Sequence, residues 1–138
     1  MWKYYALLSA LFAALTAILA KVGVRGVDSD LATAIRTSVI LVLTWGIALA
    51  GHHEVGLRSV GTGTWVALIL SGIATGLSWL FYFKALSCGD VSLVAPVDKL
   101  SVVITIVLSF IILKEPVSLR VIIGAVLITC GSIVMLTK

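Results

Sequence analysis

Residues 91–113 read VSLVAPVDKLSVVITIVLSFIIL, and this apolar run is one of five that decide the fold of the chain. A helix needs about 20 apolar residues to cross the ~30 Å hydrocarbon core of a bilayer. Lipid offers the backbone no hydrogen-bonding partners, so a spanning segment must satisfy its own N–H and C=O groups as a helix. The run therefore predicts a membrane-spanning helix, and it carries two adjacent charges, Asp98 and Lys99, inside that helix.

Four further runs of similar length fill most of the remaining sequence. Hydrophobic residues make up 61% of the 138 residues and charged residues 12%, against about 25% charge in soluble domains. We therefore predict an all-α integral membrane protein, with one domain over residues 1–138. The first run is longer than a signal-peptide core and is expected to span the membrane. The five helices are expected at about residues 4–20, 31–50, 64–86, 91–113 and 117–136.

The connecting segments are short, which leaves no room for an appended enzyme domain. Ser87–Asp90 and Lys114–Pro116 read as tight turns, so the helices that they join should lie antiparallel and adjacent. Pro116 is expected at the start of the last helix, where its missing N–H costs little. Because no paired His or nucleophile–base set lies inside the helices, the sequence does not indicate an intramembrane enzyme.

The sequence does not indicate a metal-binding, cofactor-binding or nucleic-acid-binding protein either. The net charge of +4 is modest and no basic run is present. Cys88 and Cys130 have no metal or redox spacing. His52-His53-Glu54 resembles a metal cluster, but it lies in a polar stretch without further ligands, so a solvated loop is the favoured interpretation. No metal and no cofactor are expected.

The ionisable residues inside the apolar runs are the most informative, because intramembrane charge is costly and usually faces a cavity or a partner. Asp98 and Lys99 lie about eight residues into the fourth run, Arg36 about five residues into the second, and Lys84 in the last turn of the third. All four enter from the same side of the membrane. They are expected at similar depth, with an excess of positive charge.

Two interpretations of these charges remain open. Asp98, Ser101 and Thr105 share a helix face, and Pro96, one turn earlier, permits a kink, which together suit a water-filled cavity. Alternatively, Asp98 pairs with Arg36 or Lys84 to hold the bundle together while Lys99 reaches toward the membrane surface. Both interpretations can be true, because a residue that couples transport can also form an ion pair in one state of the protein.

Small residues indicate where helices approach closely in lipid. Gly72 and Gly76 form a small-xxx-small pair in the third run. Gly124 and Gly131 lie seven residues apart on one face of the fifth. These glycines predict contact surfaces, either within one subunit or between two.

The chain resembles a single EamA domain of the drug/metabolite transporter superfamily. The resemblance rests on the order and spacing of four stretches and covers nearly the whole chain. They are 32–43 (ATAIRTSVILVL), 79–86 (WLFYFKAL), 91–96 (VSLVAP) and 113–131 (LKEPVSLRVIIGAVLITCG).

The resemblance implies a secondary transporter built from inverted repeats. Typical members hold two five-helix units inverted relative to one another, whereas this chain holds one, so it is expected to pair with a second copy as an inverted homodimer. The related small multidrug resistance family pairs in this way, through a glycine pair that Gly124 and Gly131 resemble. That family also carries an essential Glu in its first helix. The corresponding run here has no acidic residue, so its proton/cation antiport chemistry does not carry over.

The sequence thus predicts a homodimeric transporter of a small metabolite or amphiphile in the cell (inner) membrane. Asp98 is the candidate for proton coupling or charge recognition. The alternative is a non-transporting accessory or scaffold subunit of a larger membrane complex. The remaining candidate residues are Arg36, Lys84 and Lys99 for an electropositive cavity, Ser101 and Thr105 for its polar lining, and Trp79 and Tyr82 for aromatic walls.

Membrane orientation follows from the excess of Lys and Arg on the cytoplasmic side, and here that excess is nearly absent. Five spans place the termini on opposite sides. A single weakly specified topology and a dual topology, with copies inserted both ways, therefore stay open. The side of the amino terminus holds Lys3, Arg58, Lys114 and Arg120, and the opposite side holds Lys21, Arg25, Arg36, Lys84 and Lys138.

Reporters fused after Lys138 are expected to be found on both sides of the membrane, because the four basic side chains on one side nearly balance the five on the other. Two Lys residues added to the Gly51–Gly63 segment should bias the amino-terminal side toward the cytoplasm. The measurement is paired activity of a cytoplasmic and a periplasmic reporter. A native chain found in one orientation alone would contradict the inverted dimer and leave the transporter function standing.

Overall fold

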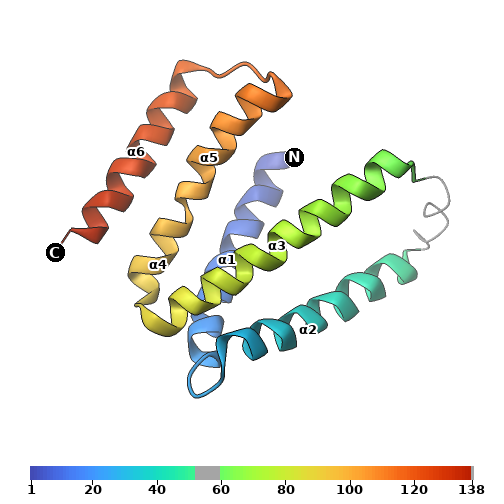
Figure 1. Ribbon diagram of the computed structural model, residues 1–138. Helices are drawn as coiled ribbons and strands as arrows, with labels where there is room; N and C mark the ends of the chain where they lie inside the picture. The colour runs from blue at the N-terminus through green and yellow to red at the C-terminus, as the bar shows by residue number, and fades with distance from the viewer. Residues whose placement is uncertain (52–59, 138) are drawn as a thin grey trace. The chain divides into compact units, whose positions relative to one another are not determined.

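The computed structural model describes residues 1–51 and 60–137, and within these ranges the chain is helical without a strand (Figure 1). Five segments are long and apolar enough to cross a membrane, which confirms the predicted all-α membrane protein. The fourth of them, Val91–Leu113, is made of three consecutive elements. The elements are α1 (Trp2–Gly23), α2 (Ser29–Ala50), α3 (Thr62–Cys88), α4 (Val91–Asp98), α5 (Leu100–Leu108), the π-helical η2 (Ser109–Leu113) and α6 (Leu119–Leu136).

The helices group into two compact units, which are described separately. One unit comprises Ile18–Cys88 and the other comprises Met1–Ala17 with Gly89–Lys138. The first unit contains α2 packed on α3 and the second contains α4, α5 and α6.

In the unit Ile18–Cys88, polar groups secure the helix ends. The carboxylate of Asp28 accepts hydrogen bonds from the backbone N–H groups of Asp30 and Leu31, at 2.9 and 3.3 Å, and so caps α2. Lys21 Nζ donates to the carbonyl oxygen of Leu86 at 2.6 Å. This cation satisfies a carbonyl in the last turn of α3, where the helix dipole favours positive charge. Leu86 is fully buried beneath it.

The fourth span is interrupted at Lys99, three residues after Pro96. The N–H that proline lacks would have bonded to the Ser92 carbonyl inside α4, and α4 nevertheless continues through Pro96 to Asp98. The N–H of Lys99 bonds to the Pro96 carbonyl at 3.1 Å, across three residues instead of four, and α4 ends at Asp98. Ser132 of α6 is 5% exposed, and its hydroxyl donates to the same Pro96 carbonyl at 3.0 Å. The interruption is therefore stabilised by a bond between helices.

The last span begins later than expected. The prediction that Pro116 stands at its start is wrong, because α6 begins at Leu119 and Ser118 caps it by accepting from the N–H of Val121. A serine oxygen satisfies a free N–H of the first turn, which a proline at that end cannot do. Pro116 instead lies in the extended connection that follows Lys114, whose φ of 55° ends η2 in a left-handed turn.

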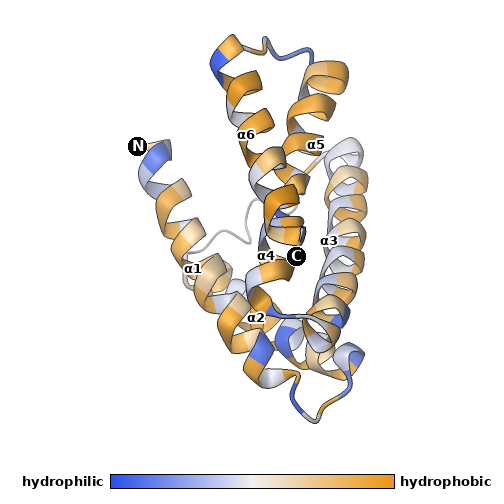
Figure 2. Ribbon diagram, turned by 90° about the vertical axis from the view of Figure 1, so that its left-hand side faces the viewer, coloured by the Kyte–Doolittle hydropathy of each residue, from blue (hydrophilic) through white to orange (hydrophobic). Residues whose placement is uncertain are grey.

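Apolar residues predominate along the helices (Figure 2), and many of their large side chains are exposed. At most 11% of the most apolar window of any span is buried within the described part of the chain. A soluble protein could not expose such a surface. These faces therefore contact lipid or another polypeptide.

Ser132→Ala tests the bond across the interruption. The variant leaves the Pro96 carbonyl with one acceptor site unfilled in lipid, so we expect a loss of about 1 kcal/mol in stability and a lower melting temperature in detergent. Thr129→Val is the control, because the Thr129 hydroxyl donates to Ala125 within α6 itself. Equal melting temperatures for the two variants would show that the Ser132 bond contributes nothing specific.

Candidate functional site

In the unit Ile18–Cys88, the intramembrane cation Arg36 lies in a cluster with Trp79, Phe83 and Tyr82. The guanidinium carbon of Arg36, on α2, lies 4.1 Å from the ring centroid of Trp79 and 5.4 Å from that of Phe83. The two rings are four residues apart on α3 and so share one face of that helix. Phe83 is 2% exposed, and Arg36 and Trp79 are half-buried. Tyr82, also half-buried, lies within electrostatic range of Arg36.

This cluster unites the predicted residues Arg36, Trp79 and Tyr82. It adds Phe83, which the sequence reading missed although its spacing from Trp79 is the signal that could have found it. Lys84 lies about 100° around α3 from Phe83 and is exposed. It is also not in the last turn of its helix, because α3 continues to Cys88.

The rings shield the charge on the faces of the guanidinium. Each cation–π contact contributes about 0.5–2 kcal/mol, more as water is removed. Arg36 is the eighth residue of α2, so seven rises of 1.5 Å place it about 10 Å from the helix start. A cation at that depth needs compensation. The rings give part of it, but they do not accept the N–H bonds of the guanidinium as a carboxylate would.

Asp98 and Lys99 form an ion pair at the interruption of the fourth span. Lys99 Nζ lies 3.4 Å from Asp98 Oδ2, with the two side chains 57% and 37% exposed. A pair so long and so accessible holds each charge loosely. Both groups remain available to other partners. The pairing of Asp98 with Arg36 or Lys84, which belong to the other unit, stays a prediction.

Lys99 also lines a groove between α4 and α6 of about 430 Å³. The groove places Lys99 and Gly131, two of the predicted residues, on one surface. Pro96 of α4 and Ser132 of α6 both line it, so the groove includes the bond that stabilises the interruption. The other lining residues are Ala95, Leu127, Ile128 and Met135.

The predicted polar stripe of the fourth span is less free than its sequence suggests. Thr105 donates its hydroxyl hydrogen to the Ser101 carbonyl at 2.8 Å, and Ser109 donates to the Ile106 carbonyl at 3.0 Å. These bonds inside the helix satisfy the hydroxyl donors without a partner from another helix. The hydroxyl oxygens of Thr105 and Ser109 therefore remain as acceptors only.

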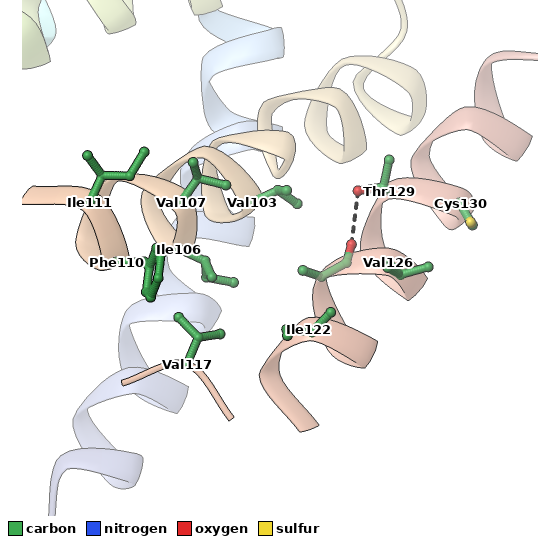
Figure 3. Close-up of a pocket in the computed structure, with 11 residues that line it drawn as sticks. Val103, Ile106, Val107, Phe110, Ile111, Val117, Ile122, Val126, Thr129 and Cys130 are labelled. Atoms are coloured by element: carbon green, nitrogen blue, oxygen red, sulfur yellow. Dashed lines mark hydrogen bonds between the residues drawn. The ribbon is translucent and has the colours of Figure 1, made fainter. Parts of the chain in front are cut away.

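A second, larger cavity of about 620 Å³ opens between α5, η2 and α6 (Figure 3). Its walls are apolar, and the hydroxyl of Thr129 donates to the Ala125 carbonyl at 2.9 Å, the dashed line of Figure 3. Such a cavity accepts apolar groups and offers nothing to a charged solute. It is lined by Val103, Ile106, Val107, Phe110, Ile111, Val117, Ile122, Ala125, Val126, Thr129 and Cys130.

The predicted contact glycines face open space. A β-carbon built at Gly124 or Gly131 meets no atom within 4 Å in the described part of the chain, and the same holds for Gly72 and Gly76. These positions are therefore not used for close helix packing among the described residues. Their role at a subunit contact stays a prediction.

The possible metal cluster His52-His53-Glu54 lies outside the described residues, as do Arg58 and Lys138. Within residues 1–51 and 60–137, no three His, Cys, Asp or Glu side chains gather as a metal group would require.

Comparison with known proteins assigns a context to this geometry. The EamA-like transporter family matches residues 1–137. A protein of Sinorhizobium sp, described as an uncharacterized transporter in the cobO 3′ region, is 46% identical over 134 residues. The alignment covers 97% of this chain and 95% of that protein. No solved structure matches the chain.

Proposed function

The chain belongs to the EamA-like transporter family, and we propose that it is a secondary transporter of a small metabolite or amphiphile. Membership of the family and the five apolar spans point to a multi-pass membrane transporter. We place it in the cell membrane, the inner membrane in a bacterium. The observation that carries the finer proposal is the accessible Asp98–Lys99 pair at the interruption of the fourth span.

Interrupted helices are the usual place where transporters bind solutes and ions near the bilayer midplane. Asp98 ends α4 and Lys99 links it to α5, so a carboxylate and an ammonium group stand where the regular backbone bonding stops. A carboxylate at this point can take up and release a proton as its surroundings change. Asp98 is therefore proposed to couple solute movement to protons, and Lys99 to neutralise it between proton transfers.

An inverted homodimer is the proposed assembly. The alignment covers 97% of this chain and 95% of the Sinorhizobium sp relative, so the two are of similar length. The open positions at Gly124 and Gly131 would let the α6 helices of two copies approach closely. The balanced Lys and Arg content favours insertion in both orientations. The substrate would lie between the two copies near the midplane.

Reconstitution in liposomes tests transport directly. Vesicles loaded with mixed small carboxylates, zwitterions and amphiphilic cations are given a pH step, and the solutes released are identified by mass spectrometry. We expect one class to leave faster than from protein-free vesicles. Release equal to that of protein-free vesicles for every class would favour the accessory-subunit alternative.

Asp98→Asn is expected to fold, reach the membrane and lose pH-driven flux, because the amide keeps the shape and removes the titrating group. The measurement is flux against pH, alongside the melting temperature. Asp90→Asn is the matched control, since Asp90 starts α4 without a capping bond from its side chain. Loss of stability together with flux would assign Asp98 a structural role, and unchanged flux at every pH would remove it from the mechanism.

Gly124→Leu or Gly131→Leu is expected to lower the yield of cross-linked dimer several-fold, because a bulky side chain separates backbones that need close approach. Gly46→Leu is the control, since that glycine on α2 also faces open space. Normal dimerisation of both α6 variants would place the subunit contact elsewhere.

A further inference from the structure

Arg36 carries a positive charge that the described residues of its own unit do not neutralise. Within the described part of Ile18–Cys88, no carboxylate lies within 4.0 Å of the Arg36 guanidinium nitrogens. The ring centroids of Trp79 and Phe83 lie 4.1 and 5.4 Å from its guanidinium carbon. A ring attracts a cation without accepting its N–H bonds in the guanidinium plane.

The geometry thus leaves a fork of donors without an anionic acceptor in its own unit. Trp79 and Phe83 lie on one helix face, and Phe83 is buried, so the two rings help to position the guanidinium before any ligand arrives. A guanidinium edge matches the two oxygens of a carboxylate in a bidentate pair. The charge of one guanidinium is neutralised by the charge of one carboxylate.

We propose that Arg36 binds the carboxylate of the transported substrate, and that Trp79 and Phe83 orient it for this purpose. The inference rests on the proposed transport function and narrows the substrate class to small monocarboxylates, with or without an amine elsewhere. Solutes whose only charge is positive are repelled by Arg36. Neutral amides of the same shape lose one of the two accepting oxygens and the charge attraction.

The test compares lactate with lactamide in proteoliposomes at pH 7, where lactate is ionised. The wild-type protein should move lactate at least tenfold faster than lactamide. Arg36→Gln should reduce that ratio to about one, because the charge and the fork are both lost. Arg36→Lys should keep the ratio partly, because it retains the charge and loses the fork. Arg25→Gln, which removes an exposed cation outside the cluster, should leave the ratio unchanged.

The ratio distinguishes recognition from damage, since a misfolded carrier loses both fluxes together. If Arg36→Gln does not accumulate in the membrane, Arg36→Lys alone supplies the comparison. An unchanged ratio in the folded Arg36 variants overturns the proposal. So does a wild-type protein that moves cations or neutral solutes while leaving lactate behind, an outcome that keeps the transport function.

Binding is measured separately by quenching of tryptophan fluorescence in detergent. Lactate should change the emission of the wild-type protein, and Trp79→Phe should abolish that change while Trp45→Phe retains it. Lactate binding without flux of any solute would support the Arg36 site and contradict the transport function. Emission that responds equally to lactate and lactamide would overturn the site.

Discussion

Every backbone polar group inside the bilayer must find its partner within the protein, and the rest of this structure depends on that constraint. The side-chain hydroxyls obey it as well. Many of those in the described spans donate to carbonyls three or four residues earlier in the same helix, as Thr37 does to Thr33, Thr75 to Ser71 and Thr105 to Ser101. The helices are therefore largely self-sufficient, which explains how they can expose apolar faces in every direction and still hold their form.

The places where this internal bonding is irregular mark the region whose side chains are available for binding. Regular bonding fails between Pro96 and Lys99, and there the chain uses Ser132 from another helix as a donor. The same few residues carry Asp98 and Lys99, the charges least compatible with lipid. A regular helix would have set them among apolar side chains with all carbonyls occupied. The interruption instead places Lys99 at a groove, where charge and an incompletely bonded backbone are tolerated together.

Much of this was predictable from sequence because it depends on local properties. Apolar run length predicted five spans, because it acts within one helix. The kink permitted by Pro96 stays a prediction, and the interruption lies at Lys99, three residues further along. The start of α6 was predicted wrongly because two local signals compete there, and the cap at Ser118 outweighs Pro116. The Arg36 cluster was predicted in part. Residue types suggested Arg36 and Trp79, but the stacking depends on the rotation of α2 against α3, which no single-helix pattern fixes. Phe83 was missed for this reason, and so was the bond from Lys21 to Leu86, which links residues 65 positions apart.

The contacts of Arg36 and of the Asp98–Lys99 pair are weak enough for a transporter, whose charged groups must release one partner and bind another in each cycle. Removing one member of a fully buried ion pair costs about 3–5 kcal/mol, which would trap a transporter in one state. Neither charged group here is held so tightly. The exposed Asp98–Lys99 pair contributes at most about 1 kcal/mol, and the rings hold Arg36 by about 0.5–2 kcal/mol each. A carboxylate that binds to Arg36, or a proton that binds to Asp98, therefore has to replace only weak interactions. The aromatic rings are the important device, because they keep a cation stable in the membrane without neutralising it. An acidic residue in their place would have stabilised Arg36 more strongly and left it nothing to bind.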